Sequence, residues 1–428
     1  MDHLSYLFAL EQFGIKFGLQ NIASLVDRLG HPERAFRVVH VAGTNGKGSV
    51  TAMIDRALRA DRRRSARYTS PHLVDLRERF VIDGESVAPA ALDAAIGRVR
   101  GVVAALRADG TLDVEPTFFE VTTAIAFELF REAGVEIAVV EVGLGGRLDA
   151  TNVVRPDVTA ITSIALDHQQ YLGRTIPEIA FEKAGIIKTG VPIIVGRLDA
   201  QADAVVVRVA AERGAPLVRA WDDADVQVDT IRADHEAASV IDVRTAAHRY
   251  GPLRLALRGA HQVDNALVAL RVLEQLHVAP DAIATGLEQV SWPGRLDVRS
   301  LPGGRQLILD AAHNPAGAAA LASYLRARGG DRLPMIFGAM RDKDADGMFR
   351  ALLPMVSALV VTRASSSSAR AADPAHLAAR ARAVAPSLPI EVAAAAADAL
   401  ERAWRRSPAV VAAGSIFLIG DILAEIDQ

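Results

Sequence analysis

The sequence Gly43-Thr44-Asn45-Gly46-Lys47-Gly48-Ser49 stands between two segments of different periodicity. Residues 37–42 form an apolar run, which predicts a buried strand, and residues 49–60 carry apolar side chains at helical spacing. A glycine-rich turn between a strand and a helix lets backbone N–H groups wrap around a phosphate. Gly48 separates Lys47 from the Ser49 hydroxyl, unlike the commonest nucleotide loops, so a glycine-rich turn without a ligand is the alternative. We predict a phosphate-binding loop and, with it, the use of ATP.

Lysine is rare in this chain. Of 48 basic residues, 43 are arginine, and the five lysines are Lys16, Lys47, Lys183, Lys188 and Lys343. Arginine can replace lysine on a solvated surface, but not where a compact charge or a deprotonatable amine is needed. Each remaining lysine is therefore a candidate for a functional role, except Lys188, which we take to have persisted by chance.

The bulk composition limits the class of protein. Half of the 428 residues are hydrophobic, which predicts two or three domains. The net charge of −3 indicates neither a nucleic-acid partner nor an anionic membrane surface. The chain has no cysteine, its N-terminus shows no targeting segment, and no apolar run is long enough to span a bilayer. We expect a cytoplasmic protein whose partners are small molecules.

Strand and helix patterns alternate along the first part of the chain, and this alternation predicts a mostly parallel sheet covered by helices. The predicted strands after the loop are residues 136–142, 157–164 and 191–196, and the predicted helices include residues 118–131 and 261–276. Between about residues 217 and 257 the pattern changes to short β-branched stretches, which predict a small antiparallel subsheet.

A second alternating series follows the turn-rich segment Trp292-Pro293-Gly294-Arg295. It predicts a smaller, Rossmann-like α/β domain, so we expect domains at residues 1–297 and 298–428. The overall class is α/β, with a P-loop-type first domain. The predicted strands of the second series are residues 306–310, 334–337, 358–362 and 409–413, and its predicted helices are residues 316–328, 374–384 and 394–405.

An apolar strand pattern ends in the carboxylate of Glu141, about a hundred residues after the loop. A carboxylate at that point suits the Mg²⁺ that accompanies ATP, although strands ending in an acid are common. Residues 143–152, GLGGRLDATN, combine a flexible backbone with polar groups, as a substrate-facing loop would.

Ten motifs run in order through most of the chain and resemble the folylpolyglutamate synthase and dihydrofolate synthase family of the Mur ligase superfamily. They are GTNGKGS (43–49), TSPHL (69–73), TFFE (117–120), EVGLGGRLDATN (141–152), DH (167–168), EKAGIIK (182–188), HQVDNA (261–266), PGR (293–295), DAAHNP (310–315) and MRDKD (340–344). The resemblance implies an ATP-binding central domain with a pterin site, followed by a glutamate ligase domain.

The resemblance also implies a nucleotide and metal site. Implied nucleotide contacts are Gly43, Thr44, Asn45, Gly46, Lys47, Gly48, Ser49, Asn265, Arg295 and Asp310. Implied ligands of two Mg²⁺ ions are Ser49, Ser70, Glu141, His168 and Lys183. From the residues alone, His168 is an unusual magnesium ligand and would be taken for a loop histidine.

Lys183 matches the lysine that is carbamylated in this family, where CO₂ converts the amine into a carbamate that helps to bind the second Mg²⁺. Such chemistry needs an uncharged amine, which arginine cannot provide. The alternative is an ordinary helix lysine that pairs with Glu182 or Glu178. Lys47, Lys183 and His313 are our catalytic candidates. His313 and Asn314 follow a strand, where open parallel sheets place ligands, or they form a plain strand-to-helix turn capped by Asn314.

The resemblance implies a pterin-binding set, and aromatic rings within it offer faces for stacking a flat heterocycle, although core packing explains buried aromatics equally well. The set is Lys16, Phe17, Gly18, Leu19, Thr117, Phe118, Phe119, Glu120, Leu148, Asp149 and Ala150. The family commonly has an acid and an arginine after the Gly-Leu pair, where this chain has Gln20-Asn21.

The implied reaction joins the carboxylate of dihydropteroate or of a reduced folate to L-glutamate through an acyl phosphate, and ATP is the co-substrate. A folylpolyglutamate synthase without the first activity is one alternative, and GGRLDATN favours the bifunctional enzyme. A peptidoglycan-type Mur ligase is another, against which TSPHL and GGRLDATN argue. An ATP-binding regulatory module lacks support, because no charged tail or coiled coil is present. We expect a monomer.

Overall fold

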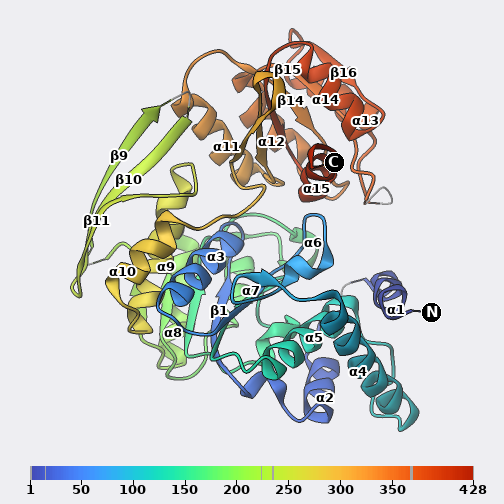
Figure 1. Cartoon of the computed structure of the whole chain (residues 1–428), viewed down its shortest axis with the longest axis vertical. Helices are drawn as coiled ribbons and strands as arrows, with labels where there is room; N and C mark the ends of the chain where they lie inside the picture. Colours follow the sequence, from blue (N-terminus) through green and yellow to red (C-terminus); the bar gives the residue numbers. More distant parts are fainter. Residues whose placement is uncertain (1, 15, 223, 234–235, 367–369, 428) are drawn as a thin grey trace.

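The computed structural model describes residues 2–14, 16–222, 224–233, 236–366 and 370–427. Within these residues the strands form three sheets. Figure 1 shows one sheet with its helices as a larger lower body, a second with its helices as a smaller upper body, and the third along one side. We call them the N-terminal sheet, the C-terminal sheet and the small sheet.

The N-terminal sheet has the strand order β4-β3-β2-β5-β1-β6-β7-β8, and β1 lies between β5 and β6 as their parallel neighbour. All residues of β5 and all but the first of β1 are buried, as expected for a central strand covered on both faces. The strands are β1 Arg37–Ala42, β2 Ser65–Tyr68, β3 Phe80–Ile82, β4 Glu85–Ser86, β5 Ile137–Glu141, β6 Val158–Ile161, β7 Ile193–Val195 and β8 Leu217–Arg219.

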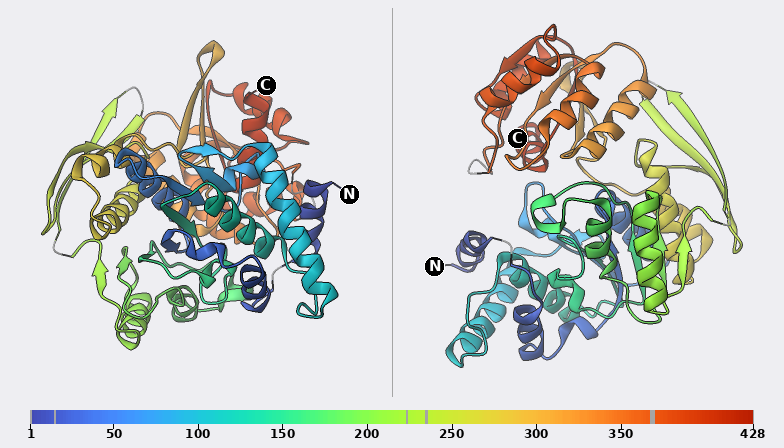
Figure 2. Two further views of the ribbon diagram at one scale, coloured as in Figure 1. Left: turned by 60° about the horizontal axis from the view of Figure 1, so that its bottom comes forward. Right: turned by 180° about the vertical axis from the view of Figure 1, so that it is seen from behind.

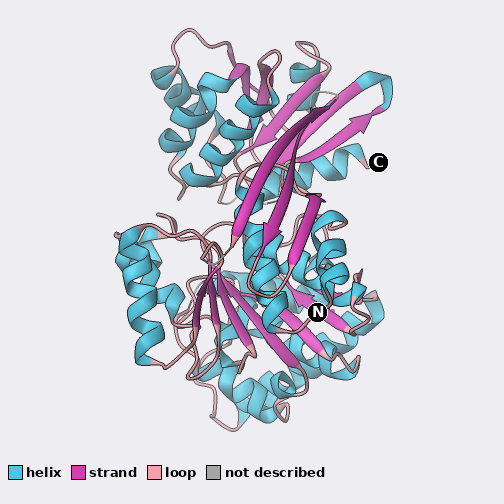
Figure 3. Ribbon diagram, turned by 90° about the vertical axis from the view of Figure 1, so that its left-hand side faces the viewer, coloured by secondary structure: helices cyan, strands magenta, loops and turns pink. Residues whose placement is uncertain are grey.

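Helices cover both faces of this sheet, and the strands spread between them in Figure 3. Val39 and Val41 pack in one hydrophobic cluster with α3, α9 and α10, whereas Val38 packs in another with α2, α4 and α5. The helices are α1 His3–Ala9, α2 Gln20–Arg28, α3 Lys47–Ala60, α4 Pro89–Ala108, α5 Phe118–Glu132, α6 Gln169–Leu172, α7 Ile176–Ala184, α8 Ala200–Glu212, α9 His261–Gln275 and α10 Pro280–Glu288. Short 3₁₀ turns are η1 Leu10–Phe13, η2 Pro32–Arg34, η3 Leu76–Arg79 and η4 Ala150–Val153.

The small sheet is antiparallel, with the order β11-β10-β9. Its strands are β9 Asp225–Ala233, β10 Glu236–Arg244 and β11 Arg249–Arg254, and β10 contacts α11 of the second body. The expected start of this sheet at residue 217 is wrong. Residues 217–219 are β8, which pairs in parallel with β7 because it follows a crossover helix, α8.

The C-terminal sheet has the order β12-β13-β17-β14-β15-β16, parallel except for the β12–β13 pair. Its strands are β12 Asp297–Leu301, β13 Arg305–Asp310, β14 Leu333–Phe337, β15 Val356–Val361, β16 Ile390–Val392 and β17 Ala409–Ala413. The helices are α11 Pro315–Arg328, α12 Ala345–Leu352, α13 Pro374–Val384, α14 Ala396–Trp404 and α15 Ile416–Ile426, with η5 Pro302–Gly304 and η6 Leu353–Met355.

The domain division stays a prediction. The expected cut between residues 297 and 298 falls at the first residue of β12, directly after the Trp292–Arg295 turn. From behind, the C-terminal body again stands on one end of the molecule (Figure 2). Among the described helices, none has both the length and the apolar character that crossing a membrane requires.

Candidate active site

The glycine-rich loop connects β1 to α3, whose first residue is Lys47. Gly43 and Gly46 have φ angles of 153° and 89°, which favour glycine. A Cβ on Gly43 would overlap the hydroxyl of Thr162, and one on Gly46 would overlap the side-chain amide of Asn265. The backbone therefore turns tightly and presents the N-terminus of α3, as an anion-binding loop does.

Gly48, the residue that sets this loop apart from the commonest nucleotide loops, lies against the indole of Trp292. A Cβ on Gly48 would be 2.8 Å from Cζ2 of that ring. The guanidinium of Arg67 lies 5.3 Å from the centre of the ring and donates to buried Asp55 at 3.0 Å. Trp292 belongs to the turn before β12, so the loop and the turn between the two bodies are in contact.

We predict that Gly48→Ala lowers the free energy of unfolding by about 1–3 kcal/mol, because the added methyl forces Trp292 or the loop to move. Alanine normally stabilises a helical position by about 0.5–1 kcal/mol, so a loss of stability is diagnostic. Gly101→Ala in α4 is the matched control, since a Cβ there has no described neighbour within 4 Å and should stabilise the protein. Urea unfolding of both variants gives the comparison, and equal behaviour would contradict the Trp292 contact.

Lys47 and Glu141 face one another beneath the loop. Lys47 Nζ donates to the carbonyls of Gly43 and Thr44 at 3.2 and 3.3 Å and lies 4.0 Å from Glu141 Oε1. The other Glu141 oxygen accepts from the backbone N–H of Ser70 at 3.2 Å. Burial raises the pKa of Glu141, while the charge of Lys47 opposes the shift. A buried carboxylate in this position gains from a further cation nearby.

Lys183 is 4% exposed and donates from Nζ to the carbonyl of Gly43 at 2.8 Å. Burial, together with the charge of Lys47, lowers the pKa of its amine to about 7. The pairing alternative does not apply: Glu182 accepts from Arg147 at 2.8 Å, and Glu178 accepts from the start of its own helix at Thr175. A substantial fraction of the Lys183 amine is therefore uncharged near neutral pH.

The loop after Glu141 packs on α7, the helix that carries Lys183. A Cβ on Gly146 would lie 2.9 Å from the Lys183 carbonyl, and one on Gly185 would overlap Arg147. The backbone N–H of Arg147 also donates to the Glu182 carbonyl at 2.8 Å. These contacts explain the glycines of both motifs, because the two segments touch backbone to backbone.

Asp167 joins the two bodies. Lys343 Nζ donates to its carboxylate at 2.6 Å, Asn314 Nδ2 donates at 2.9 Å, and His313 Nε2 lies 3.5 Å away. All three partners come from the C-terminal part of the chain. Burial raises the pKa of Asp167, but the hydrogen bond from His313 and the surrounding positive charges outweigh it and hold the pKa well below its ordinary value. Asp167 therefore stays ionised.

His168 and Asn314 complete this junction. Lys343 Nζ lies 3.3 Å from His168 Nε2, and burial, with the charge of Lys343, lowers the pKa of His168 to about 4, so the ring is neutral. Asn314 caps α11 through Gly317 N–H and also exchanges hydrogen bonds with the Asn45 amide at 3.0 and 3.2 Å. Asn314 thus caps α11, and the same side chain also contacts the loop, so the cap does not exclude a role in the site.

The remaining predicted nucleotide and metal residues surround the loop. Asn265 lies beside Gly46 and donates to Gln262 at 2.9 Å, and Gln262 donates to the Ser49 hydroxyl at 3.3 Å. Asp310 accepts from the backbone N–H groups of Leu296 and Ala312, each at 2.9 Å. Burial raises the pKa of Asp310, and the charge of Arg295 opposes that shift. Among the described residues, no three His, Cys, Asp or Glu side chains form a metal-binding group.

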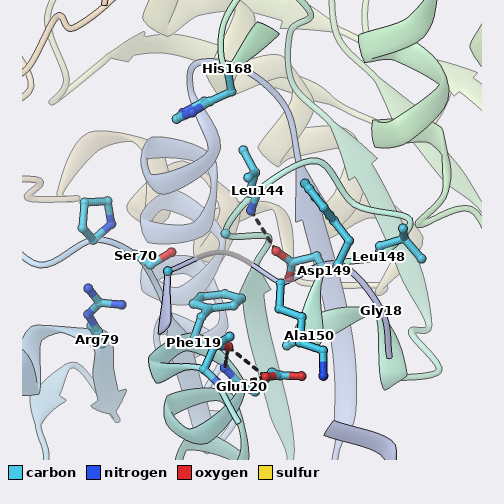
Figure 4. A pocket seen from close by; sticks show the side chains of 16 residues that line it. Gly18, Ser70, Arg79, Phe119, Glu120, Leu144, Leu148, Asp149, Ala150 and His168 are labelled. Carbon is cyan, nitrogen blue, oxygen red and sulfur yellow. Dashed lines mark hydrogen bonds between the residues drawn. The ribbon is translucent and has the colours of Figure 1, made fainter. Parts of the chain in front are cut away.

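A cavity of about 260 Å³ opens beside these groups. Figure 4 shows His168 at one end, Glu120 and Ala150 at the other, and Phe119 between them. The predicted residues that line it are Lys16, Phe17, Gly18, Ser70, Thr117, Phe119, Glu120, Leu148, Asp149, Ala150 and His168.

Two residues of the predicted pterin set lie outside this lining. Leu19 packs against the core, and Phe118 contacts the ring of Phe8 and the guanidinium of Arg79. The reason is helical geometry: α5 begins at Phe118, so the two adjacent phenylalanines face different directions and Phe119 alone reaches the cavity.

Polar contacts fix the inner end of the cavity. Glu120 accepts from the N–H and hydroxyl of Thr117 in a capping box, and Asn21 donates to the same oxygen at 3.4 Å. Asn21, where this chain departs from the family pattern, is therefore hydrogen-bonded to this end of the cavity. Asp149 accepts from the Leu144 N–H at 2.8 Å, and burial raises its pKa.

Sequence reasoning gave no role to three residues of this region, Arg79, Asp167 and Trp292, and marked Lys343 only as a functional candidate without a specific role. Arg79 is buried, lines the cavity and donates to His72 at 2.9 Å. Asp167 and Lys343 lie within quoted motifs, and the scarcity of lysine was the available signal for Lys343.

Comparisons with known proteins show the family of this chain. Two family profiles match the chain, the Mur ligase middle domain over residues 90–273 and the Mur ligase glutamate ligase domain over residues 294–416. The dihydrofolate synthase/folylpolyglutamate synthase of Bacillus subtilis is 37% identical over 367 residues, covering 84% of this chain and 84% of that protein. The chain belongs to the dihydrofolate synthase/folylpolyglutamate synthase family of Mur ligases.

Other members of the family extend the comparison. A probable bifunctional folylpolyglutamate synthase/dihydropteroate synthase of Haloferax volcanii is 36% identical over 98% of this chain, which spans only half of that longer protein. The solved structure of Mycobacterium tuberculosis folylpolyglutamate synthase with ADP and AMPPCP superposes with a TM-score of 0.90 at 34% identity, covering 100% of this chain and 99% of that one.

A further family structure is a bifunctional folylpolyglutamate synthase/dihydrofolate synthase with Mn, AMPPNP and L-glutamate bound. It has a TM-score of 0.85 at 29% identity and covers 100% of this chain and 98% of that one. The predicted family, the α/β fold class and the class of enzyme, an ATP-dependent ligase, are confirmed.

Proposed function

We propose that this enzyme forms an amide between L-glutamate and the carboxylate of dihydropteroate or of a reduced folyl-glutamate, with ATP as co-substrate. The observation that carries the proposal is the position of the cavity, which extends from Phe119 and Glu120 to His168 (Figure 4). Its His168 end adjoins Lys343, which belongs to the glutamate ligase domain and donates to Asp167. In this proposal an acceptor that fills the cavity has its carboxylate at the His168 end. The γ-phosphate of ATP and the α-amine of glutamate reach the carboxylate there.

ATP binds across the loop and the turn between the domains in this proposal. Lys47 and the N-terminus of α3 neutralise phosphate charge, and Asn265, Arg295 and Asp310 complete the nucleotide contacts. Such a site uses both domains, so it forms only when they are close together.

The residues fit divalent cations. Glu141 is a buried carboxylate whose closest cation, Lys47, is 4.0 Å away, and hard oxygen ligands suit Mg²⁺. Glu141 with Ser49 and Ser70 would hold one ion, and His168 with carbamylated Lys183 would hold a second. Bound Mg²⁺ supplies positive charge against the phosphates.

Carbamylation of Lys183 is supported by its burial and by a pKa of about 7. The neutral amine attacks CO₂, a C–N bond forms, and the released proton passes to solvent. The product carries a negative charge where the amine was neutral, so carbamylated Lys183 and His168 would together hold a second cation.

The chemistry starts from a poor electrophile. The acceptor carboxylate attacks the γ-phosphorus of ATP, the bond to ADP breaks, and a mixed carboxylic–phosphoric anhydride forms. Lys47 stays hydrogen-bonded to the loop and holds its charge beside the transferred group. The α-amine of glutamate then attacks the activated carbonyl, phosphate leaves, and an amide remains. His313, Asn314 and Lys343 come from the glutamate ligase domain and contact Asp167, and in this proposal they receive the glutamate.

An acceptor assay tests the proposal. We expect ADP release that requires L-glutamate together with a pterin acceptor. Dihydropteroate and tetrahydrofolate should each serve as that acceptor. Release with tetrahydrofolate alone would indicate a folylpolyglutamate synthase without the first activity. No release above background with either pterin, but release with a nucleotide-sugar acceptor, would assign a peptidoglycan-type ligase instead. ATP hydrolysis that ignores every acceptor would contradict all three.

A further inference from the structure

Two exposed aromatic side chains contact one another, and one of them lines the cavity, on the side that we call its mouth. Phe17 is 42% exposed and Tyr171 is 40% exposed, and their ring centres lie 6.1 Å apart with the planes at 58°. Phe17 belongs to the cavity lining, whereas Tyr171 lies on α6, three residues after His168. Large exposed apolar side chains that gather at a pocket often mark a contact surface for a ligand.

Distinct backbone features stand next to both rings. The Tyr171 N–H donates to the His168 carbonyl at 2.8 Å, and the next residue, Leu172, is buried in the hydrophobic core. On the other side, Gly18 follows Phe17 with a φ of 135°, and a Cβ there would overlap the side chain of Gln20. Both rings keep accessible faces.

The inner aromatic wall is different in kind. Phe119 stacks on Tyr68 at 6.0 Å, and Tyr68 stacks on Phe80 at 5.8 Å, both partners being fully buried. A Cβ on Gly143 would be 2.5 Å from Phe119 Cζ, so the ring is closely confined. The cavity thus has one rigid aromatic contact at its inner part and one exposed pair at its mouth.

Two aromatic contacts in series match an acceptor with two flat groups. A pteroate has a bicyclic pterin, a benzoyl ring and a carboxylate, in that order. If the pterin reaches Phe119 and Glu120 and the carboxylate reaches His168, the benzoyl ring passes between them, and Tyr171 lies on the short helix that begins directly after His168. Offset or edge-on stacking then favours an acceptor that has this second ring.

We propose that Tyr171, paired with Phe17, contacts the benzoyl ring of the acceptor and determines the preference for pteroate-type compounds. This inference rests on the proposed function, because it takes a pteroate as the acceptor. It adds a residue outside the pterin set predicted from the sequence, and it divides the cavity into a pterin part and a benzoyl part.

The test compares two ligands that differ by one ring. Pteroate and pterin-6-carboxylate are titrated calorimetrically into enzyme saturated with Mg²⁺ and AMPPNP. For Tyr171→Ala we expect pteroate binding about tenfold weaker, and pterin-6-carboxylate binding within about twofold of wild type. Tyr171→Phe should retain pteroate affinity, because it keeps the ring. Phe181→Ala removes an equally exposed aromatic, 43% exposed and stacked near Arg147, and should change neither affinity.

Kinetics give an independent readout. The KM for the acceptor should rise in Tyr171→Ala, while kcat and the KM for glutamate stay within about twofold. Unchanged pteroate affinity, or an equal loss for both ligands, would overturn the assignment to the benzoyl ring. Failure of the wild-type enzyme to bind pteroate at all would overturn the proposed function itself, which separates the two conclusions.

Discussion

Replacing Lys183 with arginine should lower kcat for ligation by about 10²- to 10³-fold, the usual effect of removing one charge-stabilising group from an active site. Arginine keeps the positive charge that the predicted carbamate would reverse, and it stays protonated at every accessible pH. The side chain is buried against the Gly43 carbonyl, so no other group can take its place from solvent. Added bicarbonate should not restore activity. Full activity of this variant would exclude a carbamate role.

Lys188→Arg is the matched control, because Lys188 lies five residues further along the same motif. It is also a partly buried lysine, donating to the Asn152 carbonyl at 2.9 Å, and burial lowers its pKa to about 8. Its replacement should leave kcat within about threefold of wild type. Wild-type enzyme in ¹³C-bicarbonate should show a carbamate carbonyl signal by NMR that Lys183→Arg lacks and Lys188→Arg keeps. A signal that persists in Lys183→Arg would place the modification elsewhere.

Replacing Lys47 with methionine should lower kcat by roughly 10³-fold and weaken AMPPNP binding about tenfold, because the only lysine of the loop supplies charge to the phosphates. The amine also holds the loop through the Gly43 and Thr44 carbonyls, and its loss leaves Glu141 without its closest positive partner. Stopped-flow kinetics and calorimetry measure the two effects.

Arg56→Met provides the comparison for Lys47→Met on the same helix. Arg56 donates to Gln289 at 2.6 Å, away from the loop. It should bind AMPPNP normally and change kcat less than twofold. If Lys47→Met kept kcat within tenfold of wild type, the loop would not be the phosphate site. A parallel loss of thermal stability in Lys47→Met alone would indicate a structural role instead.

Strongly apolar elements of the fold could be predicted from the sequence. β1 and β17 begin and end at the predicted residues, because central strands are continuous apolar runs bounded by polar residues or glycine. Helix α4, twenty residues long, was not predicted, since it is rich in alanine and its apolar stripe is weak. The error at residues 217–219 has a related cause: three residues carry no periodicity, and their pairing with β7 decides their sheet.

The roles of single site residues remain predictions, but their grouping in space can be compared with the sequence. Lys47, Glu141 and Lys183 are separated by more than forty residues along the chain and meet around the Gly43 carbonyl and its loop. Motif matching selected each of them without knowing that they touch. Asp167 received no role, because its three partners come from another domain and only the structure brings them together.

The sequence by itself determined the family, the fold class and the class of reaction, because glycine-rich turns, apolar periodicities and motif order are local properties of a chain. Only the tertiary structure decided which residues act together. Burial, which depends on the surrounding elements, gives Lys183 its lowered pKa. Helix phase directs Phe119 into the cavity and Phe118 away from it. The need for glycine at position 48 is explained by Trp292, 244 residues further on, which packs where a side chain would be. A local sequence pattern does not indicate which distant residue packs against a glycine.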